Sequence, residues 1–278
     1  MKTESNPIKA SIIMSTYNAE EWLEKVIFGF SVQDEQQFEI IIADDGSTDK
    51  TRILIEKLRQ LITQPIIHVW HEDKGFQKTL ILNKAILATS SNYLIFTDGD
   101  CIPRKDFVST HLKFKEKGCF LSGGYFKLSM TISQLISNQD IINQNCFSKK
   151  WLVKNGLKKS IKNIKLTSNG FLAKVLNFIT PTNASWNGHN SSAFKEDILA
   201  INGFNNSMQY GGEDREFGER LINLGLKSKQ IRYNAICVHL DHKRGYVNQE
   251  ALSKNLEIRK NTRQNKTIKT PNGLDFYS

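Results

Sequence analysis

Apolar residues in the first hundred positions follow two alternating patterns. Short runs rich in isoleucine, valine and phenylalanine are typical of buried strands, and between them apolar residues recur at helical spacing. The predicted strands cover residues 10–15, 38–43, 66–70 and 93–96, and the predicted helices cover residues 22–30, 53–61 and 79–88. Strands that alternate with helices favour an α/β fold with a mostly parallel central sheet and helices on both faces.

Polar residues follow the ends of three of these strands. They are Thr16, Tyr17 and Asn18 after the first strand, Asp44 and Asp45 at the second, and Asp98, Gly99 and Asp100 after the fourth. Ligands of such sheets bind beyond the carboxyl ends of the strands, so we expect these residues around one pocket. The absence of Gly-x-Gly-x-x-Gly and Gly-x4-Gly-Lys-Ser/Thr motifs disfavours a dinucleotide site and a P-loop.

The two carboxylates on either side of Gly99 raise a question of charge. Asp98 and Asp100 repel each other unless a positive group lies beside them. Oxygen ligands suit Mg²⁺ or Mn²⁺, and either cation would also allow acidic groups to face a nucleotide diphosphate. The sequence therefore indicates a divalent cation at the end of the fourth strand.

Two further clusters of ionisable residues lie in the second half of the chain. Glu213 and Asp214 follow a flexible Gly-Gly pair and precede a helical pattern, while His239 and His242 follow a predicted strand at 235–238. Acids in the first turn of a helix are favoured by its dipole, so capping alone explains the first cluster. Histidines at a strand end are by default hydrogen-bonded groups, although this pair is spaced to reach one metal ion. Both interpretations stay open for each cluster.

Residues 149–165 contain seven lysines and no acid. Their lysines recur near helical spacing and their apolar residues share another face, as in helices that lie on an anionic membrane surface. A solvated basic helix packed on the protein explains the pattern equally well, and Gly156 disfavours a continuous helix. The polar tail after residue 248 suits either an extra helix or partial disorder.

Composition changes this picture little. An apolar fraction of 39% in 278 residues is ordinary for a globular protein, and the four cysteines form no Cys-x-x-Cys pair that would signal a zinc site. No apolar run reaches the roughly 18 to 20 residues that span a bilayer, and the first ten residues carry no apolar signal segment. We therefore expect a cytoplasmic protein, with a peripheral position at the inner face of the membrane as an alternative.

The net charge of +10 suits a polyanionic neighbour: nucleic acid, an anionic membrane or a phosphorylated substrate.

Taken together, the motifs resemble family 2 glycosyltransferases with a galactosyltransferase-type C-terminal segment. In chain order they are Thr16-Tyr17-Asn18, Asp44-Asp45-Gly46-Ser47, Lys74-Gly75-Phe76-Gln77 with Asn83, Asp98-Gly99-Asp100, Asn202-Gly203-Phe204, Gly211-Gly212-Glu213-Asp214 and the pair His239 and His242. The likeness covers about residues 10–245 with a gap at 118–180. Residues 187–224 are similar to the acceptor-site segment of β-1,4-galactosyltransferases and bacterial chondroitin-type polymerases.

This resemblance implies a GT-A fold, in which a nucleotide-sugar-binding half joins an acceptor-binding half. We expect residues 1–115 to form the donor half, 116–180 a variable basic insertion, 181–245 the acceptor and catalytic half, and 246–278 a tail. The implied donor is a nucleotide-diphospho-sugar, most often a UDP-sugar. The implied acceptor is a saccharide or lipid-linked saccharide of cell-surface polysaccharide or lipopolysaccharide synthesis. The implied reaction inverts the anomeric carbon with Mn²⁺ or Mg²⁺, and no nucleic acid partner is expected.

Roles for single residues also follow from the resemblance. Thr16, Tyr17, Asn18 and Asp45 would hold the base, Asp98 with Gly99 the ribose, Lys74 and Lys78 the phosphates, and Asn190 the donor sugar. Asp100 and His242, with His239, would bind the metal, Asp214 would act as catalytic base, and Glu213 would bind the acceptor. Surface charge explains the two lysines as well, and a polar loop explains Asn190.

The chain departs from the family's pattern at two positions, and two other functions compete. His239 stands where galactosyltransferases have a methionine ligand, and Tyr210 where a tryptophan usually precedes Gly-Gly-Glu-Asp, which leaves the metal and both sugars open. A sugar-phosphate nucleotidyltransferase is disfavoured because no glycine-rich, arginine-bearing loop follows the first strand. A non-enzymatic nucleic-acid-binding protein is disfavoured because only Trp151 interleaves with the basic run.

Overall fold

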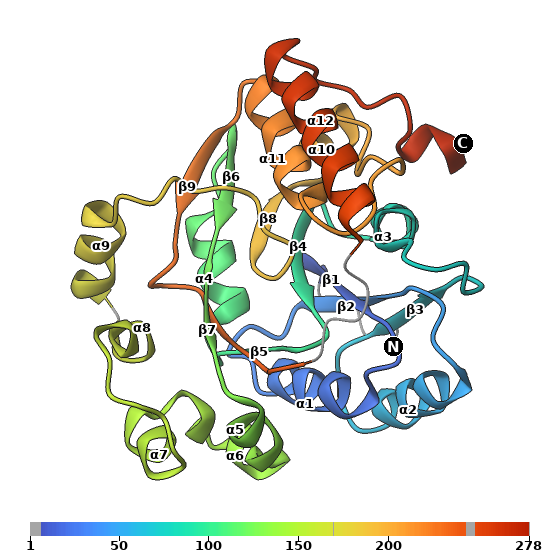
Figure 1. Cartoon of the computed structure of the whole chain (residues 1–278). Coiled ribbons are helices and arrows are strands. Elements are labelled where there is room, and N and C mark those ends of the chain that lie inside the picture. Colours follow the sequence, from blue (N-terminus) through green and yellow to red (C-terminus); the bar gives the residue numbers. More distant parts are fainter. Residues whose placement is uncertain (1–6, 169, 243–247, 278) are drawn as a thin grey trace.

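The computed structural model describes residues 7–168, 170–242 and 248–277. Strands and helices alternate through the first half of the chain, as the apolar pattern predicts (Figure 1). These elements are β1 (Ala10–Thr16), α1 (Glu20–Ser31), β2 (Phe38–Asp44), α2 (Asp49–Arg59), β3 (Ile66–Trp70), α3 (Lys78–Leu87), β4 (Tyr93–Asp98), β5 (Cys101–Pro103) and α4 (Phe107–Phe114). Each predicted strand and helix of this region is therefore confirmed. The observed and predicted bounds agree within two residues, except that α2 begins four residues before its predicted start.

The described residues after α4 form mostly shorter elements, including the 3₁₀ helices labelled η, although α12 is longer than any helix of the first half. These elements are β6 (Cys119–Ser122), β7 (Gly124–Lys127), α5 (Met130–Leu135), α6 (Asn138–Ile142), η1 (Asn145–Phe147), α7 (Lys149–Lys154), η2 (Ile161–Asn163), α8 (Ile164–Thr167), α9 (Gly170–Ile179), β8 (Ser191–Phe194), α10 (Lys195–Ala200), α11 (Glu213–Asn223), β9 (Lys227–Gln230), β10 (Ile236–His239), α12 (Gln249–Gln264) and η3 (Leu274–Tyr277). Helix α12 shows that the polar tail forms an extra helix.

A seven-stranded sheet in the order β3-β2-β1-β4-β8-β6-β9 forms the centre of the protein. Strands β3, β2, β1 and β4 run parallel to one another, while β8 runs antiparallel to both of its neighbours. A second sheet of three strands, β5-β10-β7, lies beside it. Because β8, β6 and β9 come from beyond residue 115, both halves of the chain share the central sheet. The predicted mostly parallel α/β architecture is confirmed.

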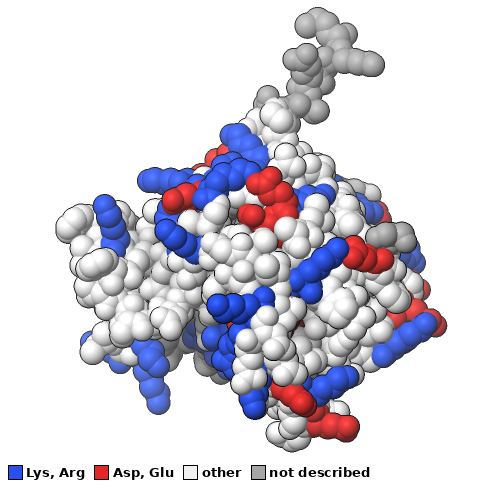
Figure 2. Space-filling model, turned by 90° about the horizontal axis from the view of Figure 1, so that it is seen from above, with Lys and Arg blue, Asp and Glu red and all other residues white. Residues whose placement is uncertain are grey.

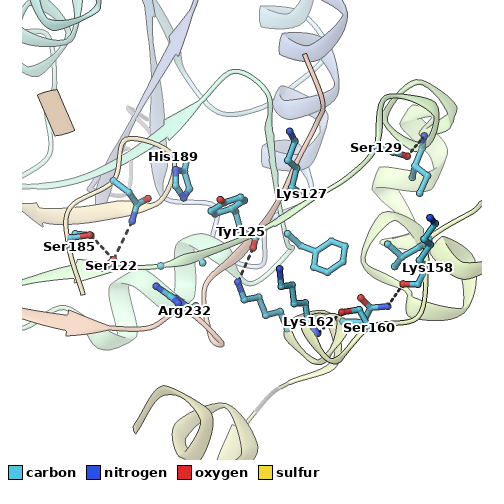
Figure 3. Close-up of a pocket in the computed structure, with 18 of the residues that line it drawn as sticks. Ser122, Tyr125, Lys127, Ser129, Lys158, Ser160, Lys162, Ser185, His189 and Arg232 are labelled. Carbon is cyan, nitrogen blue, oxygen red and sulfur yellow. Dashed lines mark hydrogen bonds between the residues drawn. The ribbon is translucent and has the colours of Figure 1, made fainter. Parts of the chain in front are cut away.

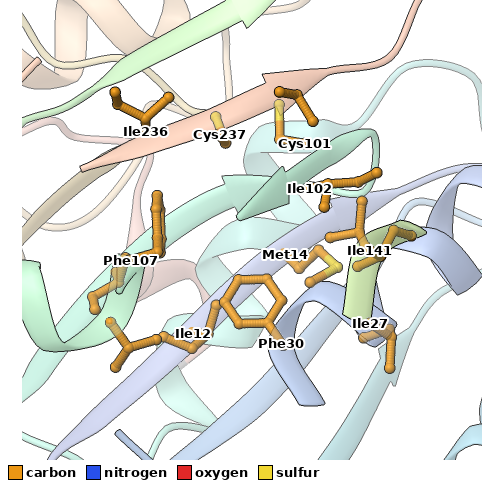
Figure 4. Packing of buried hydrophobic residues seen from close by; sticks show 14 of the residues in the cluster. Ile12, Met14, Ile27, Phe30, Cys101, Ile102, Phe107, Ile141, Ile236 and Cys237 are labelled. Atoms are coloured by element: carbon orange, nitrogen blue, oxygen red, sulfur yellow. The ribbon is translucent and has the colours of Figure 1, made fainter. Parts of the chain in front are cut away.

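Two apolar clusters cover the two faces of this sheet. Side chains of successive strand residues point to opposite faces, so Ile12 and Met14 of β1 join one cluster and Ile13 joins the other. Helices α1 and α2 contribute to the first cluster, and α3 and α11 to the second. Figure 4 shows Phe30 of α1 packed beside Ile12 and Met14, with the small sheet above them. The sheet is therefore buried on both faces, and its strand ends are held in fixed positions.

The basic segment 149–165 does not form one helix. Helix α7 ends at Lys154, and Gly156 has a φ of +102°, a conformation that lies outside the helical region and favours glycine. The chain turns helical again only at η2. A continuous amphipathic helix over 149–165 is therefore wrong, because Gly156 breaks it. Among the described helices, none combines the length and the apolar character needed to cross a bilayer.

The charged side chains are dispersed on the face that Figure 2 shows. Lysine and arginine side chains are scattered over it, and aspartate and glutamate side chains lie among them. A basic stripe that could follow a nucleic acid backbone would have to gather cations on one face. The visible surface does not have that arrangement.

Candidate active site

A cavity of about 920 Å³ opens where β1, β2 and β4 end. The predicted site residues that line it are Thr16, Tyr17, Asn18, Asp45, Lys78, Asp98, Gly99, Asp100, Glu213, Asp214, His239 and His242. They come from six regions of the chain that are far apart in sequence, and Lys78 is the first residue of α3. The parallel sheet brings the first strand ends together, and α11 and β10 add the remaining groups.

Asp98, at the end of β4, is held by two donors. Its Oδ1 accepts hydrogen bonds from Lys78 Nζ at 2.8 Å and from Ser15 Oγ at 2.7 Å. Burial opposes the charge, but the nearby ammonium outweighs it and holds the pKa of Asp98 below its usual range. The same pairing raises the pKa of Lys78. Asp98 is therefore ionised and fixed, and the positive group that its charge requires is Lys78.

Asp45 and Tyr17 line the same cavity, and both are oriented by residues that follow β3. Asp45 accepts a bond from the Gln77 backbone N–H at 3.0 Å and contacts His71 Nε2 at 2.8 Å. The Tyr17 hydroxyl donates to Asp73 Oδ2 at 2.8 Å. In such a pair the carboxylate can accept a hydrogen bond from an N–H of a heterocyclic base, and the aromatic ring can stack against the face of that base.

A second group of ligating atoms surrounds Asp100. Its Oδ2 lies 3.0 Å from His242 Nε2 and 3.7 Å from His239 Nε2, and the two imidazole rings stack with centroids 5.6 Å apart. One ligand atom each from Asp100, Cys101 and His239 fits within 4.8 Å. The buried Nδ1 of His239 has no hydrogen-bond partner among the described residues.

This donor set fits a divalent cation. The carboxylate suits Mg²⁺ or Mn²⁺, and two imidazoles favour a transition-metal ion over Mg²⁺, which prefers oxygen ligands. The thiol of Cys101 is buried, and burial raises its pKa well above the ordinary value, so it is not a ready thiolate ligand. Asp100, His239 and His242 are therefore the residues that would hold the metal.

Glu213 and Asp214 are the first two residues of α11, and their carboxylates have different surroundings. Gly212 takes a φ of +96° at the N-cap and no side chain caps the helix, but the Glu213 carboxylate accepts the Gly211 backbone N–H at 2.8 Å and so stabilises the turn before the helix. Asp214 lines the cavity, and its buried Oδ1 has no partner in the described structure. Capping therefore does not explain Asp214.

The environment of Asp214 changes its acidity. Burial, followed by the charge of Glu213, raises the pKa of Asp214 to about 7, although Lys78 opposes the shift. The backbone N–H of Gly188 donates to the carboxylate, and a Cβ at Gly188 would come within 2.8 Å of Asp214 Oδ2. A side chain at position 188 would displace this carboxylate, so glycine lets the loop before β8 approach it closely. A carboxylate with a pKa near 7 and a free oxygen is suited to accept a proton from a substrate.

Two predicted site residues lie outside the cavity. Lys74 is exposed and lies 3.4 Å from Glu72, which matches the surface alternative. Asn190 is fully buried, and its amide donates to the carbonyl of Gly124 at 2.8 Å and receives His111 Nε2 at 2.9 Å. The structure uses Asn190 to join strands rather than to face a ligand.

Sequence reasoning missed three residues that support or line the site. His71 contacts the carboxylate of Asp45, Asp73 accepts the hydroxyl of Tyr17, and His189 lines the cavity wall. His71 and Asp73 follow β3, so applying the strand-end rule to the third strand would have found them. His189 carries no such signal, because its loop has no repeating pattern. Burial lowers the pKa of His189 to about 4, so its ring is neutral.

Comparison with known proteins identifies the family. Residues 11–168 match the model of glycosyl transferase family 2, which is more than half of the chain. The chain belongs to glycosyltransferase family 2. Residues 178–243 match a second model, the N-terminal domain of galactosyltransferase, which confirms the galactosyltransferase-type C-terminal segment.

Two curated relatives show the same likeness over most of the chain. A Bacillus subtilis protein described as the glycosyltransferase YfnE is 24% identical over 84% of this chain and 65% of its own length. Chondroitin synthase of Escherichia coli is 25% identical over 82% of this chain and 34% of its own length. The chain thus spans between about a third and two thirds of these relatives.

Solved structures confirm the GT-A fold. Staphylococcus aureus TarS in complex with UDP-GlcNAc superposes with a TM-score of 0.59 at 16% identity, over 90% of this chain and 65% of that one. A mannosyltransferase of Pyrobaculum calidifontis in complex with GDP-Man and Mn²⁺ has a TM-score of 0.56 at 16% identity, over 95% of this chain and 64% of that one. The predicted α/β fold and family are therefore both confirmed.

Proposed function

We propose that this glycosyltransferase is inverting and metal-dependent, and that it moves a sugar from a UDP-sugar to a saccharide or lipid-linked acceptor of cell-surface polysaccharide synthesis. The observation that carries the proposal is one cavity that holds both Asp214, whose Oδ1 has no partner in the described structure, and the ligating group of Asp100, His239 and His242. Residues 1–115 would bind the donor, and residues 181–245 would supply the base and part of the acceptor site.

The residues of the cavity divide the work between them. Asp45 and Tyr17 would hold the base, while Asp98, kept ionised by Lys78, would accept hydrogen bonds from the ribose. A divalent cation bound by Asp100 and the two histidines supplies positive charge that stabilises a departing diphosphate. Asp214 would accept the proton of the acceptor hydroxyl, whose oxygen attacks the anomeric carbon from the side opposite the diphosphate. A single displacement of this kind inverts the configuration.

Calorimetric titration of UDP tests the donor half of this proposal. Wild-type protein should bind UDP with Mn²⁺ and lose most of the affinity with chelator. Asp100→Asn should bind equally weakly in both conditions, because it removes the charged ligand. Asp214→Asn is the matched control and should keep the wild-type affinity, because Asp214 acts on the acceptor. Equal UDP binding by wild type and Asp100→Asn in Mn²⁺ would contradict the assignment of Asp100.

We also propose a peripheral position on an anionic membrane. The side chains of Phe171 and Phe178 on α9 are 81% and 90% exposed, and Ile161 of η2 is 91% exposed. Lysines of η2 and α9 accompany them, and both elements lie on the same outer side of the protein (Figure 1). Exposed aromatic residues beside lysines are typical of surfaces that enter the headgroup region of a bilayer.

Vesicle sedimentation tests the membrane surface. The wild-type protein should sediment with phosphatidylglycerol vesicles and not with phosphatidylcholine vesicles. The double variant Phe171→Ser/Phe178→Ser should remain in the supernatant, while Phe276→Ser, which changes a 74% exposed ring on η3, should sediment like the wild type. Unchanged sedimentation of the double variant would exclude α9 as the docking surface.

A further inference from the structure

A second cavity, of about 760 Å³, lies beside the first and is lined by cations. Its basic side chains are Lys127, Lys158, Lys162, Lys165, Arg215 and Arg232, and no aspartate or glutamate lines it among the described residues. Figure 3 shows Lys158 and Lys162 on one side of the space and Arg232 on the other, with Tyr125 and Lys127 between. We refer to this space as the basic cavity.

The positive charge of the basic cavity is largely uncompensated. Lys127 lies 3.3 Å from Asp241, but no carboxylate of the described chain pairs with the other five cations. Lys165 donates to the Tyr125 carbonyl at 3.5 Å, and its ammonium lies 5.8 Å from the centroid of the Tyr125 ring. Burial and the neighbouring charges of Arg232 and Lys162 lower the pKa of Lys165. Like charges are thus held close together without an anion of the protein, an arrangement that favours an anionic ligand.

The basic cavity meets the candidate active site at one wall. His189 lines both cavities, and the ring of Tyr125 packs edge-on against it with centroids 4.6 Å apart. The consecutive residues Asp214 and Arg215 line the active-site cavity and the basic cavity, respectively. A ligand in the basic cavity therefore has its near end beside the carboxylate to which we assign the role of base.

We propose that the basic cavity binds the acceptor and that this acceptor carries phosphate esters. This inference rests on the proposed function. Lysine ammonium groups and arginine forks are the usual partners of phosphate, and several separated cations suit several phosphate charges. The half-exposed ring of Tyr125 offers a surface on which a sugar or polyol can lie.

The group transfer then balances as follows. The acceptor hydroxyl gives its proton to Asp214, and its oxygen forms a bond to the anomeric carbon of the donor. The bond between that carbon and the diphosphate oxygen breaks, and the diphosphate leaves with the electron pair. The acceptor phosphates take no part in bond changes and only position the hydroxyl.

Two kinds of acceptor carry this chemistry: a polymer of polyol phosphates and a diphosphate-linked lipid carrier. A soluble glycerol phosphate oligomer represents the first, and a sugar linked to farnesyl diphosphate represents the second. Glucose and glucuronate serve as a neutral and a carboxylate probe. We expect one of the two phosphate probes to bind, and glucose and glucuronate to bind at least about tenfold more weakly. The phosphate probe that binds shows which kind of acceptor the cavity takes.

The variant Lys162→Gln/Lys165→Gln/Arg232→Gln removes three cations of the basic cavity. The control Lys154→Gln/Lys159→Gln/Lys174→Gln removes three cations of the same region that do not line it. Exposed charge pairs each contribute a factor of about 1.5 to 5, so the cavity variant should weaken binding of the phosphate probe on the order of tenfold. The control variant should bind as tightly as the wild type.

The same proteins separate this inference from the proposed function. Probe binding is measured with chelator and without donor, and UDP binding with Mn²⁺ is measured separately. Equal binding of glucose and the phosphate probes, or equal losses in both triple variants, would overturn the basic cavity as a phosphate site while leaving the donor proposal intact. Phosphate binding lost only in the cavity variant, followed by transfer to the bound probe, supports the inference. Such binding without transfer from any donor that the protein hydrolyses would overturn the acceptor assignment.

Discussion

Replacing Asp214 by asparagine should remove activity and increase stability at the same time. A rise of the pKa from 3.8 to about 7 corresponds to about 4 kcal/mol of unfavourable free energy for the charged form. Because Asp214 lines an open cavity, water reduces this cost, and we expect about 1 to 2 kcal/mol. Asparagine keeps the shape and removes the charge.

The sign of the effect depends on pH. A carboxyl group with a raised pKa in the folded state favours folding below its unfolded pKa, and this contribution is lost as the pH rises through about 7. At pH 8.5 the asparagine variant should therefore melt about 2 to 8 °C above the wild type. The difference should shrink toward pH 5, where Asp214 is protonated. Transfer by the wild type should rise with pH and level off above about 7.

Thermal melting in chelator at pH 5 and 8.5, together with transfer rates, checks this prediction. Loss of a general base should lower the rate by about 10² to 10⁴-fold. Asp49→Asn is the control, because Asp49 is an exposed acid in the first turn of α2, and it should change neither quantity by much. An Asp214→Asn protein that is less stable than the wild type at pH 8.5, or that keeps full activity, would refute the reasoning.

Two other substitutions test charge pairs, one in the active-site cavity and one buried inside the fold. Lys78→Met should destabilise the fold by about 1 to 3 kcal/mol, because it leaves the partly buried Asp98 without its cation, and urea unfolding measures this cost. Because Lys78 also lowers the pKa of Asp214, the acid limb of the pH–rate profile should move to higher pH, and a shift to lower pH would contradict the assignment. Arg220→Met should cost about 3 to 5 kcal/mol in urea unfolding, since it leaves Glu216 buried and unpaired. Adding Glu216→Gln to Arg220→Met should recover part of the lost stability. A double variant as unstable as Arg220→Met alone would show that the unpaired Glu216 charge does not cause the loss.

The sequence was most informative where the chain follows one repeated rule. Alternating strands and helices place the carboxyl ends of β1, β2 and β4 at one edge of the sheet, so the proximity of Asp45, Asp98 and Asp100 could be predicted. The role of Lys78 was harder to predict, because a lysine at the start of a helix is usually exposed. Only the folded position of α3 shows that it pairs with Asp98.

Features that depend on contacts between distant segments could not be predicted. The pairing of β6 with β8 and β9 joins segments separated by about 70 to 110 residues, and none of them has a strong apolar pattern. The basic cavity likewise gathers Lys127, Lys162, Arg215 and Arg232 from different elements. In the sequence Lys162 belongs to the basic run at 149–165, while the other three contribute only to the net charge, which carries no position. Residues 149–165 show that lysines at helical spacing do not ensure a helix, because the positive φ of Gly156 interrupts it.

Release of nucleotide diphosphate by the full chain tests the central claim most directly. UDP-, GDP- and dTDP-sugars are supplied one at a time with Mn²⁺ or with chelator, in the presence of the phosphate-bearing probes. We predict release from a UDP-sugar with Mn²⁺, loss of that release with chelator, and loss of the release with Asp214→Asn despite intact UDP binding. Release that is equally fast with chelator, or with Asp214→Asn, would contradict a metal-dependent transfer with Asp214 as its base.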